Sequence, residues 1–212
     1  MGSIQRFNLG QLSEEFNIST FVETGTYEGS GTKYAYDSGF HQIHTIEIDP
    51  DYYLAANYRF KDFANIFLHL GSSHLVISNL INSPFLKEEN VLFWLDAHFP
   101  LADKGQVSYR HTIDPVVRMP IISELQAIVS NRNNGYRDVI IIDDLRCFVD
   151  DARIPAASFD EHMKTLGARG EGCTRDSVVG VCLEDILRVT EGFFLPQLVF
   201  EDEGYLVLLP CD

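Results

Sequence analysis

The sequence predicts an α/β protein built on a Rossmann-like, doubly wound sheet of seven strands, mostly parallel, with an antiparallel hairpin at its C-terminal end. Three observations support this. Short β-branched or aromatic runs alternate with helix-like segments along the chain. Two of the runs, VLFWL within 91–96 and VIII within 138–144, are apolar throughout, which is typical of central strands covered on both faces. The segment 194–210 holds two further apolar runs around a turn at Asp202 to Gly204.

The elements follow one another in regular βα order. Strands before the hairpin are expected at 20–25, 42–49, 65–71, 91–96 and 138–144. Helices are expected at about 30–38, 51–60, 73–82, 119–132 and 177–191. Asp49-Pro50, Ser72 or Ser73, and Pro120 supply the expected helix starts. The core is therefore expected to centre on the first, fourth and fifth strands.

Length and composition predict one domain spanning residues 1–212, because 45% hydrophobic content supports a substantial core and no linker or repeat interrupts it. A formal net charge of -15 with scattered Lys and Arg disfavours nucleic acid as a partner. The start MGSIQRF lacks an apolar signal region, and no apolar run approaches the ~18 residues of a membrane span. We therefore expect no membrane contact and a cytoplasmic location.

The cysteines support the same expectation about location. Cys147, Cys173, Cys182 and Cys211 form neither a C-x-x-C pair nor a zinc spacing. Such cysteines fit a reducing compartment better than a disulfide framework, so we expect buried or idle thiols.

Two connections are longer than a βα unit needs. Residues 97–118 and 145–176 each follow a central strand. Ligands of open α/β sheets bind beyond the carboxyl ends of the strands, where the strand order reverses. The two segments are therefore expected to form the substrate side of a site.

A glycine-rich turn, FVETGTYEGSG at 21–31, follows the first strand. Its glycines permit positive φ angles and a close approach of a ligand to the backbone, as in nucleotide-binding turns. The dinucleotide spacing G-x-G-x-x-G fails because Tyr27 stands at the second glycine, and no Gly-Lys-Ser/Thr follows Gly25 as in a Walker loop. An ordinary tight βα turn is the alternative interpretation.

Acidic residues end four of the five strands, although helix capping explains some of them, such as Asp49. The acids at these ends are Glu23, Glu47, Asp49, Asp96, Asp143 and Asp144. Glu47 lies about twenty residues after the glycine turn, where an acid can accept hydrogen bonds from ribose hydroxyls. Glu23 can favour a cationic group. Because the turn also lacks a Lys or Arg for a pyrophosphate, these features favour S-adenosylmethionine over NAD.

On these motifs the chain resembles the class I S-adenosylmethionine-dependent methyltransferases, in particular small-molecule and sugar O-methyltransferases of the catechol and macrolide-sugar type. The pattern E-x-G-x-x-x-G from Glu23 to Gly29 is similar to the first family motif. The resemblance implies that the methionine part of the cofactor lies against Gly25, Thr26 and Gly29, with Glu23 nearby.

Two further motifs extend the resemblance. IEIDPDYY at 46–53 is similar to the second family motif, which implies that Glu47 holds the ribose and that Ile48 packs against the adenine. LGSSH at 70–74 is similar to the third, which implies that Ser72 and Ser73 lie near the adenine edge.

FWLDAH at 93–98 and IIIDDLR at 140–146 resemble segments of the divalent-dependent O-methyltransferases. That resemblance implies a site of Asp96, Asp143 and Asp144 for Mg²⁺ or Mn²⁺, an optional second cofactor that would bind and acidify an acceptor hydroxyl. Asp96 is also assigned to cofactor binding and catalysis. His98 is a candidate general base or fourth ligand, and a hydrogen-bonded loop histidine is the alternative.

The chain departs from the catechol type after the fourth strand. The lysine commonly used there as a base is not visible, since Ala97 to Leu101 follow Asp96. LFWLDAH and IDDLR are also similar to bacterial methyltransferases associated with glycan decoration, which suggests a sugar hydroxyl as acceptor. Arg146 and His111 are either contacts for such an acceptor or ordinary solvated side chains.

The sequence thus predicts an S-adenosylmethionine-dependent O-methyltransferase acting on a small-molecule or glycosyl hydroxyl, with divalent-metal assistance as an option. Nitrogen acceptors are disfavoured because no Asn-Pro-Pro-Tyr segment follows the fourth strand. The alternatives are an NAD(P)-dependent oxidoreductase on the same sheet and a non-catalytic S-adenosylmethionine-binding module. The expected partners are the acceptor and, as one option for assembly, a second copy in a homodimer.

Overall fold

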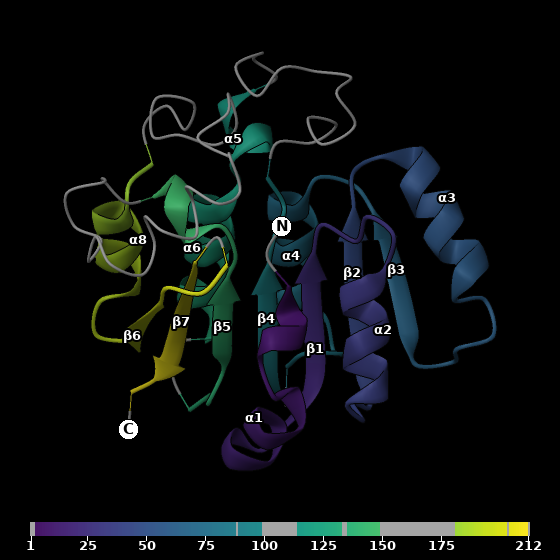
Figure 1. Ribbon diagram of the computed structural model, residues 1–212, viewed down its shortest axis with the longest axis horizontal. Helices are drawn as coiled ribbons and strands as arrows, with labels where there is room; N and C mark the ends of the chain where they lie inside the picture. Colours follow the sequence, from purple (N-terminus) through teal and green to yellow (C-terminus); the bar gives the residue numbers. More distant parts are fainter. Residues whose placement is uncertain are drawn as a thin grey trace.

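The computed structural model describes residues 3–87, 89–98, 114–132, 135–148, 181–202 and 204–211. It contains one seven-stranded sheet in the order β3-β2-β1-β4-β5-β7-β6 (Figure 1). The strands are β1 (Ile18–Thr24), β2 (Gln42–Glu47), β3 (Ile66–Leu70), β4 (Asn90–Leu95), β5 (Val139–Ile142), β6 (Phe194–Val199) and β7 (Tyr205–Pro210). The first five strands pair in parallel, whereas β7 pairs antiparallel with β5 and with β6. The predicted doubly wound sheet and C-terminal hairpin are confirmed.

Helices cover both faces of the sheet. The α-helices are α1 (Leu9–Phe16), α2 (Ser30–Asp37), α3 (Pro50–Arg59), α4 (Ser73–Ile81), α5 (Pro115–Arg118), α6 (Ile121–Arg132) and α8 (Leu183–Thr190). Two 3-10 turns accompany them, η1 (Ile4–Arg6) and η2 (Leu145–Cys147). The sequence did not predict α1 and α5, because neither follows a strand directly in the βα pattern. Within the described ranges, none of the helices combines the length and apolar character that a membrane span requires.

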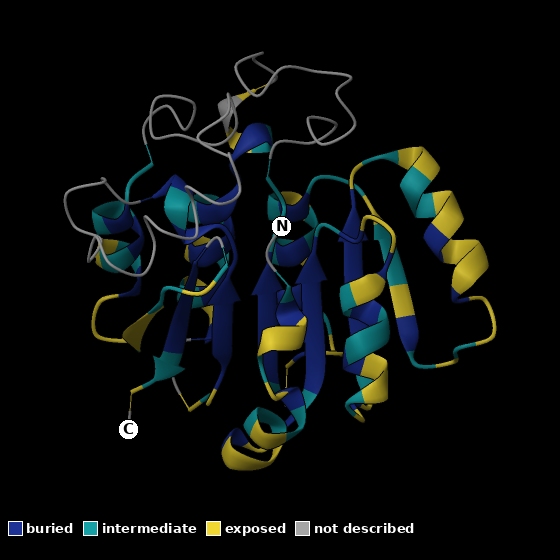
Figure 2. Ribbon diagram, viewed as in Figure 1, coloured by how far each residue is buried: buried dark blue, intermediate teal, exposed yellow. Residues whose placement is uncertain are grey.

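The two faces of the sheet bury different cores. Val22 of β1 belongs to the core under α4, α6 and α8, and its neighbour Phe21 belongs to the core under η1, α1, α2 and α3. This division follows from the alternation of side chains along a strand. Figure 2 shows buried strands in the centre of the sheet and exposed residues on the edge strands β3 and β6. The prediction of a core centred on β1, β4 and β5 is confirmed.

The strand order reverses at β1, which has β2 on one side and β4 on the other. Backbone hydrogen bonds continue beyond the strand ends. The N–H of Gly25 donates to the carbonyl of Ile46 at 3.0 Å, and the N–H of Asp96 donates to the carbonyl of Thr24 at 3.2 Å. The residues that follow β1, β2 and β4 are therefore held together at one edge of the sheet, where ligands of doubly wound folds bind.

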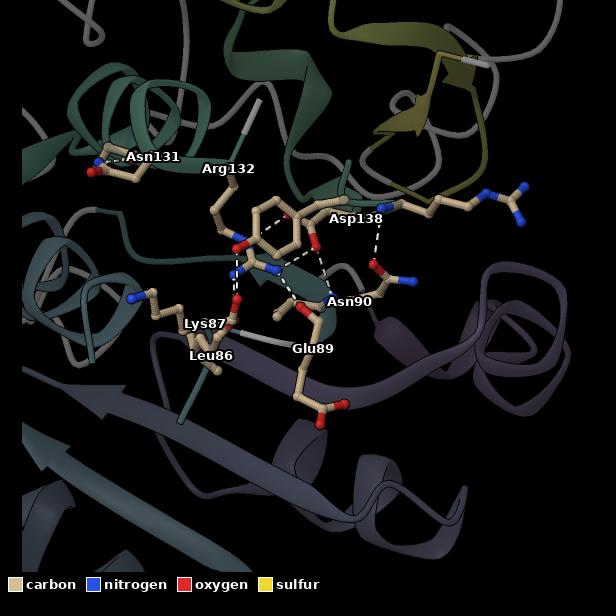
Figure 3. Close-up of polar contacts among 11 residues, drawn as sticks. Leu86, Lys87, Glu89, Asn90, Asn131, Arg132 and Asp138 are labelled. Carbon is tan, nitrogen blue, oxygen red and sulfur yellow. Dashed lines mark hydrogen bonds and ion pairs between the residues drawn. The ribbon is translucent and has the colours of Figure 1, made fainter. Parts of the chain in front are cut away.

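A buried ion pair lies at the other end of the strands, where β4 and β5 begin (Figure 3). Arg132 at the end of α6 contacts both carboxylate oxygens of Asp138, at 2.6 and 2.8 Å, and its guanidinium also donates to the carbonyl of Leu86 at 2.6 Å. Asp138 in turn accepts the N–H of Val91 at 2.8 Å. The ring of Tyr136 lies 4.0 Å from the guanidinium carbon. The contacts join α6 to the starts of β4 and β5.

One prediction about the cysteines is wrong. Cys147 is fully buried and disulfide-bonded. Cys182 and Cys211 are free. The sequence argument relied on spacing along the chain, whereas a disulfide depends on the distance between two residues in space.

Candidate active site

The glycine turn after β1 is compact, and its glycines are required by neighbouring protein groups. Gly25 has a φ of +84°, and a Cβ atom there would lie 2.7 Å from the carbonyl oxygen of Asp96. Gly29 has a φ of +76°, and a Cβ atom would lie 2.5 Å from the ring of Phe60. The turn can pass so close to the end of β4 and to α3 only because these side chains are absent.

Glu23 lies beneath the turn and is 2% exposed. Its Oε2 atom accepts hydrogen bonds from the hydroxyls of Thr32 in α2 and Thr45 in β2, the latter at 2.7 Å. Burial raises the pKa of Glu23 to about 7, although the two hydroxyl donors oppose the shift. Glu23, which the sequence predicts as a partner for a cationic group, is thus an internal residue that links α2 and β2 below the turn.

Glu47 ends β2 directly beside the turn. One of its carboxylate oxygens accepts the N–H of Tyr27 at 2.8 Å, and the other accepts the N–H of Asp49 at 2.8 Å. Tyr27 has a positive φ of 47°, which is unusual for a residue with a large side chain. A carboxylate offers about four lone-pair positions, so these two contacts fix its orientation and leave capacity for ligand hydroxyls. The next residue, Ile48, is 37% exposed.

The two serines predicted at the adenine edge differ in orientation. Ser72 is at the N-cap position of α4 but makes no side-chain capping hydrogen bond, and its hydroxyl lies 3.0 Å from Nδ1 of His74. Ser73 is 5% exposed, and its hydroxyl bonds to the carboxylate of Glu124 in α6. The hydroxyl of Ser73 therefore makes an internal contact between α4 and α6.

Glu124 is a residue that the sequence reasoning missed. It is 1% exposed, it accepts hydrogen bonds from Ser73 and Thr24, and its Oε1 atom has no hydrogen-bond partner among the described residues. Burial raises the pKa of Glu124 to about 7, and the hydroxyls and the charge of His98 oppose the shift. The signal was present in the helical pattern, because the buried stripe of α6 includes Glu124 among the apolar residues Ile121, Leu125 and Ile128.

His98, after β4, joins the acids at the ends of β4 and β5. Its Nε2 atom lies 2.5 Å from Oδ2 of Asp144, and its Nδ1 atom lies 3.5 Å from Oδ1 of Asp96. Asp144 has a left-handed backbone conformation, with φ 56° and ψ 47°, and its Oδ1 atom lies 3.2 Å from the guanidinium of Arg146. Asp143 is buried, and its Oδ1 atom accepts the N–H of Asp144 at 2.8 Å. The structure thus brings all the predicted catalytic and metal-binding residues together.

The charges in this cluster shift one another's pKa values. Burial lowers the pKa of His98, but the charge and hydrogen bond of Asp144, together with the charges of Asp96 and Asp143, outweigh it and raise the pKa to about 10. Burial and the charge of Asp143 raise the pKa of Asp96 well above its ordinary value, and His98 opposes this. His98 is therefore an imidazolium at neutral pH, which is not the protonation state of a general base.

The cluster does not have the arrangement of a metal site. In the part of the chain that the structure describes, no group of three or more His, Cys, Asp or Glu side chains could hold a metal ion. The oxygens of Asp144 face the nitrogens of His98 and Arg146, and one oxygen of Asp143 accepts a backbone N–H. A guanidinium beside one oxygen of Asp144 and an imidazole beside the other do not fit the six-oxygen shell that Mg²⁺ and Mn²⁺ prefer.

The predicted substrate-side segments are described only in part. Of 97–118 the structure describes 97–98 and 114–118, and of 145–176 it describes 145–148. His111 lies outside the described residues. Arg146 has the ion pair with Asp144 and is not an ordinary solvated side chain.

Comparisons with solved structures identify the fold. A methyltransferase from Podospora anserina, bound to S-adenosylhomocysteine, matches with a TM-score of 0.57 and 13% identity over 100% of this chain and 80% of that chain. The O-methyltransferase TomG from Streptomyces achromogenes, in complex with S-adenosylmethionine and involved in tomaymycin synthesis, matches with a TM-score of 0.54 and 14% identity over 100% and 82%. An O-methyltransferase from Bacillus cereus matches with a TM-score of 0.56 and 13% identity over 100% and 83%.

The chain therefore has the fold of the class I S-adenosylmethionine-dependent methyltransferases. A scan of the sequence against protein-family models finds no match, and a search of curated proteins finds none. At identities of 13 to 14%, the likeness is one of fold, and the chemistry has to be argued from the residues of this chain.

Proposed function

We propose that the protein is an S-adenosylmethionine-dependent O-methyltransferase that acts on a small-molecule or glycosyl hydroxyl. The observation that carries the proposal is the position of Glu47 at the reversal of strand order, with its carboxylate held by the N–H groups of Tyr27 and Asp49 beside the glycine turn. A fixed acid at this place can accept two hydrogen bonds from a ribose. The shared fold with methyltransferases that bind this cofactor supports the choice of ligand.

Each part of the cofactor has proposed contacts near this acid. Glu47 holds the ribose, and the exposed side chain of Ile48 packs against the adenine, with Ser72 and Ser73 at its edge. The methionine part lies along the turn, against Gly25, Thr26 and Gly29, with Asp96 beside it. Glu23 acts from below by placing negative charge under the turn when it is ionised. Gly25 and Asp96 are in direct proximity, which supports a shared role.

In the proposed reaction, the acceptor oxygen attacks the methyl carbon of the sulfonium, the C–S bond breaks with its electron pair going to sulfur, and the hydroxyl proton passes to the carboxylate of Asp96. Positioning of the two reactants supplies much of the rate. Asp96 is the proposed catalytic residue, and His98 is proposed as the residue that positions it. The side chain of Asp96 is 33% exposed, so it can accept a hydrogen bond from the acceptor hydroxyl, and His98 orients it.

Binding measurements test the proposal at its first step. Calorimetric titration of the protein with S-adenosylmethionine, S-adenosylhomocysteine, NAD and NADP should show saturable binding of the first two only. Tight NAD(P) binding without affinity for S-adenosylmethionine would favour the oxidoreductase alternative. A screen of sugars and phenols for methyl transfer then separates an enzyme from a binding module, because a module would bind the cofactor and methylate none of them.

Other predictions remain proposals. They are a single domain over residues 1–212, a homodimer, a cytoplasmic location, and substrate-side roles for 97–118 and 145–176. Divalent-metal assistance is left out of the proposal, because the oxygens of Asp144 face the side chains of His98 and Arg146. Size-exclusion chromatography with light scattering tests the dimer. The disulfide at Cys147 removes one argument for a reducing compartment, so cell fractionation is the appropriate test of location.

A further inference from the structure

The acidic cluster at the ends of β4 and β5 is held by nitrogen groups of the chain itself. His98 lies between two carboxylates, with Nε2 at 2.5 Å from Asp144 and Nδ1 at 3.5 Å from Asp96. Arg146 contacts the second oxygen of Asp144 at 3.2 Å, and the backbone N–H of Asp144 contacts Asp143 at 2.8 Å. The side chains of His98, Asp144 and Arg146 are 17%, 9% and 19% exposed, so water screens these contacts only weakly.

We propose that His98 and Arg146, in place of a divalent cation, hold the Asp96–Asp143–Asp144 cluster together, and that methyl transfer by this protein needs no metal. The statement about metal binding stands on the geometry of the cluster, and the statement about methyl transfer rests on the proposed function.

Both carboxylate oxygens of Asp144 face nitrogen groups of the chain. Mg²⁺ binds a carboxylate oxygen at about 2.0–2.1 Å, whereas the Oδ2 atom of Asp144 already accepts from Nε2 of His98. A cation bound there would also approach the guanidinium of Arg146, whose permanent positive charge repels it. Removal of His98 should therefore increase the affinity of the cluster for a divalent cation, whereas removal of a ligand from a metal site should lower it.

Asp96 and Asp144 both contact His98, and the side chain of Asp96 is more exposed than that of Asp144. With the ring of His98 fixed by Asp144, Asp96 is left to face the acceptor. His98 is thus a positioning residue that acts through Asp96, and it differs from a metal in that it is fixed to the chain and cannot be removed by a chelator.

The test is direct binding of Mn²⁺, followed by the electron paramagnetic resonance signal of the free ion and by calorimetry, on the intact chain. The proteins are the wild type, His98→Ala, His98→Asn as a second variant in case the first is poorly folded, and His41→Ala as a control at an exposed histidine. We expect no saturable site in the wild type or the control. His98→Ala or His98→Asn should gain a site at least about tenfold tighter than any wild-type binding, since Asp144 loses its buried partner. The gain should disappear when Asp144→Asn is added.

The proposal is overturned if the wild type binds Mn²⁺ at a saturable site that Asp144→Asn abolishes. It is also overturned if both His98 variants fold and neither gains a Mn²⁺ site. Titration of the same preparations with S-adenosylmethionine keeps the two claims apart. Loss of cofactor binding in the wild type would contradict the proposed function and leave the Mn²⁺ result in place. If cofactor binds, turnover should be equal with and without a chelator, and inhibition reversed by added Mg²⁺ contradicts the second half of the proposal.

Discussion

The Nε2 atom of His98 lies 2.5 Å from the Oδ2 atom of Asp144, so a side chain after β4 is joined to a side chain after β5. The two residues are 46 positions apart in the sequence. Their ion pair fixes the relative position of two segments that end at the candidate active site.

This ion pair should give the protein a pH-dependent stability at alkaline pH. The pKa of His98 is raised from 6.5 to about 10, so its contribution to folding is complete below pH 6.5 and is lost as the pH rises to about 10. The difference in the free energy of unfolding between the wild type and His98→Gln should shrink over this range. Urea denaturation at several pH values measures it, with the exposed His41→Gln as control. If the difference in the free energy of unfolding between the two proteins does not change with pH, the raised pKa of His98 is contradicted.

Glu47→Ala should weaken S-adenosylmethionine binding by about 10- to 100-fold, because hydrogen bonds to a charged group contribute about 1.5–3 kcal/mol. Calorimetric titration measures the change, and Glu14→Ala, at an exposed position of α1, is the control. Glu47 also holds the N–H of Tyr27, so a melting curve of each variant should accompany the titration. Unchanged affinity in folded Glu47→Ala would exclude the proposed ribose contact.

Glu124→Gln should make stability less dependent on pH between about 4.5 and 7. The pKa of buried Glu124 is raised from 4.5 to about 7, so the carboxyl group favours folding below pH 4.5, and this contribution falls as the pH rises through 7. Relative to Glu124→Gln, the wild type should lose on the order of 3 kcal/mol across this range. Unfolding by urea in matched buffers measures the difference, and the exposed Glu14→Gln should show none. Parallel curves for the wild type and Glu124→Gln would refute the shift.

Asp138→Asn should destabilise the fold by about 3–5 kcal/mol, because it leaves the guanidinium of Arg132 buried without its counter-charge. The double variant Arg132→Met/Asp138→Leu should recover part of the loss. Asp37→Asn is the matched control, since it breaks the exposed pair with Lys33, which is expected to contribute at most about 1 kcal/mol. Denaturation midpoints of the three variants are compared with that of the wild type. Equal losses of stability in Asp138→Asn and Asp37→Asn would show that the buried ion pair contributes no more than the exposed one.

Most of the fold could be predicted because its signals are local. The apolar runs of β4 and β5 are continuous, and Asp49 caps α3 through the N–H groups of Asp51 and Tyr52, as the Asp49-Pro50 start indicates. The helix α1 was missed because the βα alternation gives no expectation before the first strand. The sequence does not predict the disulfide of Cys147, because spacing along the chain does not report distance in space.

The sequence predicted where the acidic residues gather and did not predict which groups they contact. Strand ends placed Glu23, Glu47, Asp96, Asp143 and Asp144 at one edge, and the structure brings them there. Glu124 was missed because it belongs to a helix, and a search of strand ends does not include helices.

The sequence by itself determined the order and type of the elements and the edge of the sheet at which the acidic residues gather, because periodicity and chain order are properties of neighbouring residues. Only the tertiary structure decided which group each acid contacts. Glu23 bonds to Thr32 and Thr45, and Asp144 pairs with His98 and Arg146. The physical reason is that side-chain pairing and burial depend on how segments far apart in the chain pack, and these contacts shift the pKa values on which the chemistry depends.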